Sequence, residues 1–217
     1  GERVDEISSY TSGGVYVAGV ISFVKEWYFK AEWYEKYDLL EYLSFIDKKA
    51  FRLGFFNKCN SALKREMSGY RIVDESIVQI TSEEEIIEIE EALRSSSIWE
   101  PVNIHLKTSI EYFSNRENPD FRNSIKEAIS AVESLCIIIT GDKDATLGKA
   151  LSEIEKKYKI HGALKSAFSS LYGYTSDSGG IRHSLLEDDI TVTMEDAKFM
   201  LVSCSAFINY LKVKIEQ

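Results

Sequence analysis

Along most of the chain, hydrophobic residues recur every three or four positions, which is the spacing of one face of an α-helix. The stretches with this spacing predict helices over residues 15–30, 31–47, 49–68, 83–94, 101–115, 120–140, 146–158, 161–172 and 194–215. The first two are either one long helix or two consecutive helices. Because the later helices have short connections, we expect an all-α protein whose second part is an antiparallel helical bundle.

A β-strand pattern interrupts these helices in one place. Residues 70–73 and 77–80 are rich in β-branched side chains and flank the polar residues 74–76, which predicts a small β-hairpin. The acidic helix 83–94 follows it, and we expect four of its apolar side chains to face inward. They are Ile86, Ile87, Ile89 and Leu93.

Capping signals define the ends of several predicted helices, because a glycine after a helix and a paired polar residue before one satisfy the free main-chain groups there. The C-cap signals are Gly69 and Gly141, and the N-terminal pairs are Ser82 with Glu85 and Thr193 with Asp196. The serines at 95–97 mark a boundary near residue 96. Residues 1–96 then form an aromatic-rich helical part ending in the hairpin and the acidic helix, and residues 97–217 form the bundle.

The first two predicted helices are unusually aromatic. Their aromatic residues are Tyr16, Phe23, Trp27, Tyr28, Phe29, Trp33, Tyr34, Tyr37, Tyr42 and Phe45. Aromatic residues at helical spacing are most often anchors of a core, and we expect that here. A dimer surface and a face that stacks on nucleic acid are the alternatives.

The net charge and the cysteine content of the chain limit the kinds of partner that we expect it to bind. The 217 residues carry a net charge of -9, so the chain as a whole does not attract nucleic acid, although a local basic patch stays open. The three cysteines, Cys59, Cys136 and Cys204, have neither metal-ligand spacing nor a disulfide pattern, and we expect buried thiols in a reducing cytoplasm.

The apolar run 15–24 is too short to span a bilayer. We expect no metal, cofactor or membrane partner. Since the chain begins with Gly1 rather than Met, we expect a processed or truncated protein.

The segment YGYTSDSGGIRHSLL, residues 172–186, breaks the helical pattern and is the candidate site. It places Arg182 beside His183, a guanidinium that could hold phosphate and an imidazole that could transfer a proton near neutral pH. Gly179 and Gly180 allow a close approach of the backbone to a ligand. Ser176 and Asp177 before them could cap a helix or shape a phosphate-binding loop, and turn formation is their commoner role.

Glu133 is the carboxylate most directly associated with this candidate site. It lies beside the apolar stripe of helix 120–140, where a carboxylate seldom stays unpaired, and the candidate partners are Arg122, Lys126 and Arg182. A pair with Arg182 would orient the loop and leave His183 free to act. Glu127 points away from the stripe, and we expect it to be solvated. Of the remaining histidines, His105 has no ligand-spaced neighbour in its helix, and His161 opens a helix before Gly162, where a histidine more often sets a cap or packs on its neighbours.

Three phrases resemble the C-terminal region of AbiJ-type abortive-infection proteins: FRNSIKEAISAVESL, ATLGKALSEIE and IHGALKSAFSSLYGYTSDSGGIRHSLL. WYFKAEWYEKYDLLEYL, near the start, resembles the same family, whose N-terminal part we expect to be shortened here. The resemblance implies a HEPN-like helical bundle, antiviral defence, cleavage of RNA without a metal, and dimerisation that builds a composite cleft.

Catalytic HEPN domains carry an Arg, often followed by Asn, and then a His a few residues further on. Arg122 and Asn123 have the front of this motif, but Glu127 occupies the first position open to the His; Arg182 is followed directly by His183. Two hypotheses follow. In the first, the protein is a ribonuclease with His183 as general acid or base and Arg182 or Arg122 as phosphate clamp. In the second, it is a non-catalytic HEPN-like module for dimerisation, sensing or partner binding.

Overall fold

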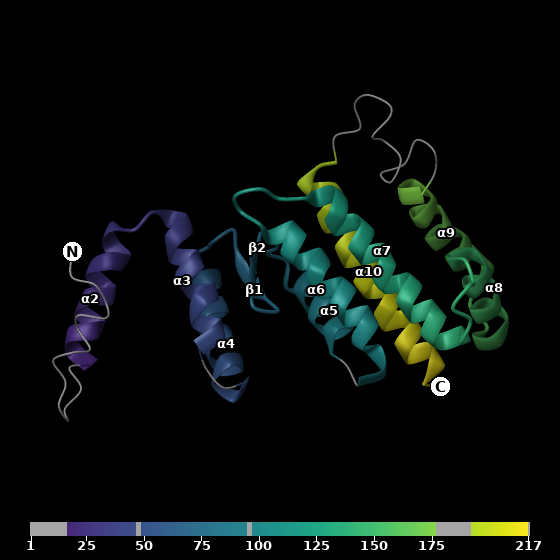
Figure 1. The fold of residues 1–217 in the computed structure, drawn as a ribbon, viewed down its shortest axis with the longest axis horizontal. Coiled ribbons are helices and arrows are strands. Elements are labelled where there is room, and N and C mark those ends of the chain that lie inside the picture. The colour runs from purple at the N-terminus through teal and green to yellow at the C-terminus, as the bar shows by residue number, and fades with distance from the viewer. Residues whose placement is uncertain (1–16, 47–48, 95–96, 177–191, 217) are drawn as a thin grey trace. The chain divides into compact units, whose positions relative to one another are not determined.

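A computed structural model describes residues 17–46, 49–94, 97–176 and 192–216 (Figure 1). Its contacts divide the chain into two compact units, Gly1–Arg52 and Leu53–Gln217, and each is considered by itself. The described part is helical apart from one small hairpin, so the predicted all-α fold with a hairpin is confirmed.

The first unit contains α2 (Val17–Lys30) and α3 (Trp33–Ile46), so this region forms two consecutive helices. The helices separate at Glu32, whose main-chain N–H donates to the carboxylate of Glu35 at 2.7 Å. Reaching back in this way satisfies one of the free donors at the start of α3.

Several aromatic side chains of these two helices are exposed, and the expectation of a core is wrong for them. Phe29 is 82% exposed, Trp33 53% and Tyr42 63%. Trp33 packs edge-on against Tyr34 and Tyr37 of its own helix, with ring centroids 5.9 and 6.2 Å apart. Such contacts within one helix leave much of each ring facing outward.

The helix α4 (Lys49–Arg65) crosses from the first unit into the second. It ends earlier than the glycine signal predicted, since Met67, with a φ of 52°, takes the left-handed conformation before Gly69 is reached. A methionine in that conformation is uncommon.

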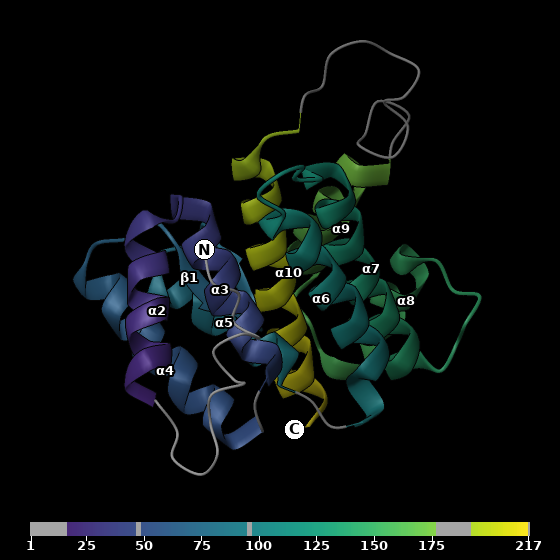
Figure 2. The same cartoon turned by 60° about the vertical axis from the view of Figure 1, so that its left-hand side comes forward.

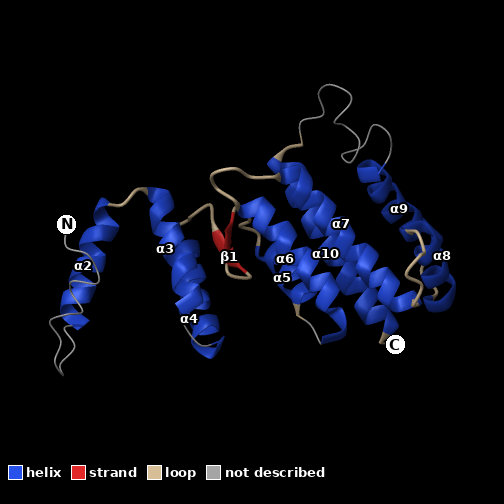
Figure 3. Cartoon of the chain, viewed as in Figure 1, coloured by secondary structure: helices blue, strands red, loops and turns tan. Residues whose placement is uncertain are grey.

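The hairpin consists of β1 (Arg71–Val73) and β2 (Ser76–Val78), drawn red in Figure 3. The strands are antiparallel, and Ile72 lies opposite Ile77. The two loop residues between them, Asp74 and Glu75, both have positive φ, as a tight primed turn requires.

Asn60 of α4 fixes the hairpin to the second unit. Its Nδ2 donates to the main-chain oxygen of Ile72 at 2.9 Å, and its Oδ1 accepts from the N–H of the same residue at 2.8 Å. The side-chain amide thus pairs with β1 as a neighbouring strand would. The hairpin is also buried: Ile72, Val73, Ile77 and Val78 are each at most 2% exposed, and Val73 and Val78 belong to the hydrophobic core.

The rest of the second unit is a set of helices joined by short connections. They are α5 (Glu83–Leu93), the 3₁₀ turn η1 (Ser97–Trp99), α6 (Glu100–Ser114), α7 (Phe121–Thr140), α8 (Leu147–Tyr158), α9 (Gly162–Ser176) and α10 (Met194–Ile215). Gly141 ends α7 and Thr193 with Asp196 forms a complete capping box at α10, both as predicted, and the side chain of Asp120 caps the start of α7.

The most extensive helix–helix contacts within this unit join α7 to α6 and to α10 (Figures 1 and 2). The apolar stripe of α7 lies in these contacts, and Ile125, Ile129 and Leu135 are completely buried. Phe168 of α9 stacks on Phe207 of α10, with ring centroids 3.6 Å apart. The core of the unit is therefore centred on α7.

The acidic helix α5 packs against α10, so the hairpin segment and the later helices share one core. Lys198 of α10 pairs with Glu85 at 3.4 Å, and Lys212 donates to the main-chain oxygen of Ala92 at 2.7 Å near the end of α5. Ile87 is 54% exposed, so its predicted inward orientation is wrong. The domain boundary near residue 96 stays a prediction.

No helix within the described ranges combines the length and the apolar character needed to cross a membrane.

Candidate functional site

Most of the predicted loop site lies outside the described residues. This applies to Asp177, Gly179, Gly180, Arg182 and His183. Ser176 is the last residue of α9. The roles assigned to these residues stay predictions.

The first turn of α7 holds two of the other predicted site residues. Asp120 caps the helix by accepting from the N–H of Asn123 at 2.9 Å, and the Nδ2 of Asn123 donates to the same carboxylate at 2.6 Å. Asn123 is therefore engaged in capping. Arg122 beside it is half-buried, and none of the described residues forms a hydrogen bond or ion pair with its guanidinium.

Glu133 lies further along α7, half-buried next to the apolar stripe. Its predicted partner Arg182 is outside the described residues, so that pairing stays untested. Of the other two candidates, neither Arg122 nor Lys126 pairs with a carboxylate in the part of the chain that the structure describes. The charge of Glu133 adds to burial in raising the pKa of Cys136 to about 12.

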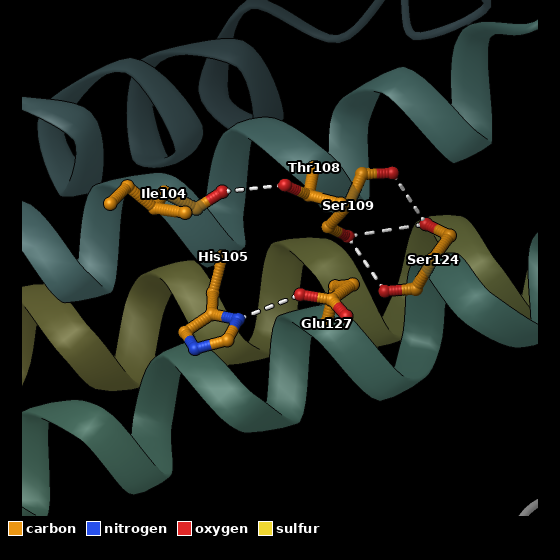
Figure 4. A network of polar contacts seen from close by, with 6 residues as sticks. All are labelled: Ile104, His105, Thr108, Ser109, Ser124 and Glu127. Atoms are coloured by element: carbon orange, nitrogen blue, oxygen red, sulfur yellow. Dashed lines mark hydrogen bonds and ion pairs between the residues drawn. The ribbon is translucent and has the colours of Figure 1, made fainter.

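A carboxylate–imidazole pair lies between α6 and α7 and was not predicted. The Nδ1 of His105 is 2.7 Å from the Oε2 of Glu127, and the two side chains are 36% and 28% exposed (Figure 4). The expectation that Glu127 is solvated is wrong, because α6 brings His105 against it. In the neutral ring that donates from Nδ1, the lone pair of Nε2 stays available to accept a proton.

Two buried serines hold the helices together one turn away (Figure 4). Ser109 donates to the main-chain oxygen of Ser124 at 2.7 Å, and Ser124 donates to the main-chain oxygen of Ser109 at 2.9 Å. Both side chains are completely buried. Small residues with reciprocal hydrogen bonds let two helices approach closely, which sets the register of α6 against α7.

That register brings His105 and Glu127 together. His105 lies four residues before Ser109, and Glu127 three residues after Ser124, so each charged residue is about one turn from its serine. Since α6 and α7 are antiparallel, the two steps lead in the same direction. The sequence signal was this matched polar spacing in two helices joined by a short connection.

The remaining histidine has a capping role. The N–H of Ala163 donates to the Nδ1 of His161 at 3.2 Å, which satisfies a free donor in the first turn of α9.

The described cysteines are free thiols, and two are deeply buried. Burial raises the pKa of Cys136 and of Cys204 to about 12, so both stay protonated near neutral pH. Within the described ranges, no cluster of three or more His, Cys, Asp and Glu side chains could hold a metal ion.

These observations define a helical protein with a small hairpin and a polar seam, His105–Glu127 and Ser109–Ser124, between two helices of its bundle. Comparison with protein families gives a match for the first part of the chain and leaves the resemblance of the later residues to the C-terminal HEPN-like region a prediction. Residues 2–95 match the model of AbiJ N-terminal domain 4, which confirms the resemblance to AbiJ-type abortive-infection proteins. The match falls in the part that was expected to be shortened. Neither a curated protein nor a solved structure matches the chain.

Proposed function

We propose that this chain is an abortive-infection effector whose second part, residues 97–217, is a HEPN-like bundle that cleaves RNA without a divalent metal. One observation carries the proposal: an AbiJ N-terminal domain over residues 2–95 is followed in the same chain by an antiparallel helical bundle. The phrases that resemble the C-terminal region of AbiJ-type proteins fall largely in α7, α8 and α9 of that bundle.

Cleavage of RNA without a metal uses the ribose 2′-hydroxyl as the nucleophile. A base must take the hydroxyl proton, and a cation must stabilise the charge that develops on the phosphorus oxygens. His183 is the predicted acid or base, and Arg182 and Arg122 are the predicted clamps. The half-buried guanidinium of Arg122, which no described carboxylate engages, supports the clamp role.

The test incubates the purified chain with RNA in the presence of a chelator and compares the wild type with His183→Ala. We expect the wild type to cleave RNA, to leave the same sequence in DNA intact, and to lose about 100-fold or more of its rate in the variant. His161→Ala is the matched control, since His161 caps α9. Wild-type protein that leaves RNA intact contradicts the proposal, and a full rate in His183→Ala contradicts the role of that residue.

A non-catalytic module for dimerisation or partner binding is the second candidate. The exposed aromatic side chains of α2 and α3, among them Phe29, Trp33 and Tyr42, support it, because large apolar groups outside a core commonly mark a binding surface. Sedimentation of the wild type and of Phe29→Ser with Trp33→Ser tests it. A dimer that the double variant dissociates supports this function, and a wild type that is monomeric at every concentration contradicts it.

A further inference from the structure

We infer that His105 and Glu127 form the proton-transfer pair of this RNA-cleaving bundle, with His105 accepting the proton of the ribose 2′-hydroxyl. The inference rests on the proposed function and adds to it a catalytic base and a residue that positions this base.

The geometry of the pair is that of an oriented base. The 2.7 Å contact between Nδ1 of His105 and Oε2 of Glu127 holds the ring in one orientation and favours the tautomer whose Nε2 is unprotonated. A base held by a third group is the arrangement that activates hydroxyl nucleophiles in enzymes. The ring is also 36% exposed, so a nucleotide can reach it from solvent.

The pair is not needed to hold α6 against α7. The reciprocal Ser109–Ser124 hydrogen bonds, fully buried one turn away, already join the two helices. Half-exposed ion pairs contribute little to stability. An imidazole and a carboxylate at the rim of a fixed seam are therefore better explained by chemistry than by packing.

Two basic residues, Arg122 and Lys126, lie on α7 within five positions of Glu127. Arg122 and Lys126 are four residues apart, so they lie along one side of α7. Lys126 directly precedes Glu127 and lies about 100° from it around the helix axis. Both are half-buried, and no described residue forms an ion pair with either. A strand of RNA that crosses the outward face of α7 could place a phosphate against these cations and a ribose against His105.

Nε2 of His105 takes the proton from the 2′-hydroxyl, and the 2′ oxygen forms a bond to the adjacent phosphorus. The bond from phosphorus to the 5′ oxygen breaks, and that oxygen takes a proton from a general acid, which recovers a proton from solvent. The products are a 2′,3′-cyclic phosphate and a 5′-hydroxyl, and the imidazolium returns its proton to solvent.

The experiment measures RNA cleavage in chelator, over a range of pH, by the wild type, His105→Gln, Glu127→Gln and Thr108→Ala. We expect about 100-fold or more to be lost in kcat for His105→Gln. Glu127→Gln keeps an acceptor for Nδ1 but loses the charge, so we expect a smaller loss together with a changed acidic limb of the pH profile. Thr108→Ala is the matched control, since the one hydrogen bond of its hydroxyl to a described residue goes to the main-chain oxygen of Ile104 on its own helix. Thermal melting checks that each variant is folded.

The outcomes separate the two proposals. Cleavage by the wild type that continues at full rate in His105→Gln, or a Glu127→Gln profile identical to that of the wild type, overturns this inference alone. RNA left intact by the wild type overturns the proposed function and this inference together. Wild-type cleavage products that carry a free 3′-hydroxyl and no phosphate at that end also overturn the inference, because the proposed step leaves a 2′,3′-cyclic phosphate there.

Discussion

The side-chain amide of Asn209 on α10 donates both to the main-chain oxygen of Glu88 on α5, at 2.9 Å, and to its carboxylate, at 2.8 Å. This one side chain joins segments that are 121 positions apart. Asn209→Leu should lower the free energy of unfolding by about 1–3 kcal/mol, because two half-buried acceptors lose their donor. Urea unfolding measures the loss. Asn118→Ala, at an exposed position, is the control, and an equal effect of the two changes would contradict the link.

The Ser109–Ser124 pair should behave as one unit. Ser109→Ala and Ser124→Ala each remove a buried hydroxyl that donates across the seam, while the main-chain oxygen it served keeps its helical hydrogen bond, so each should cost about 1 kcal/mol of unfolding free energy. In the double variant the two costs should not add, because the hydroxyls serve the same seam. A double-mutant cycle in urea measures the coupling. Strict additivity would show that the serines act independently.

The three cysteines should differ in reactivity. Burial raises the pKa of Cys136 and Cys204 to about 12, and it also raises the pKa of Cys59, which is only half-buried whereas the other two are buried. Since the thiolate is the reactive form, iodoacetamide should modify Cys59 first in the folded protein. Peptide mass spectrometry over time gives the order. Modification of Cys204 as fast as Cys59 would contradict its burial.

Glu90 should give a pH-dependent effect on stability. Burial raises the pKa of this carboxyl above its ordinary value; Arg94 opposes the rise and Asp74 adds to it. The folded state therefore holds this proton more tightly than the unfolded state, and the contribution of Glu90 to stability falls as the pH rises through the raised pKa. Glu90→Gln should thus stabilise the protein near neutral pH, and the gain should vanish in acid.

Melting temperatures of the wild type and Glu90→Gln at several pH values measure this gain. Glu111→Gln, at an exposed position of α6, is the control. A gain that grows as the pH falls would have the wrong sign for a buried carboxyl.

Local signals predicted the ends of helices well. Thr193 and Asp196 begin α10, and Gly141, with a φ of 74°, ends α7, because these residues act on main-chain groups a few positions away.

Signals that depend on the approach of another segment were less reliable. Ile87 fits the apolar period of α5 but faces outward, because α10 covers Ile86 and Ile89 on the other side. The apolar periodicity of α7 taken alone predicts that the side chain of Glu127 is solvated. Its contact with His105 depends on how α6 aligns with α7, which the periodicity of neither helix contains.

The amide of Asn60 has a consequence for assembly. In a hairpin with this register, the N–H and C=O of Ile72 are the groups of β1 that point away from β2, and Asn60 takes both. An uncovered strand edge invites a strand of another molecule to add to it. Here the outer rim of β1 is already closed from within, so a second copy that docks beside this hairpin has no open ladder to extend.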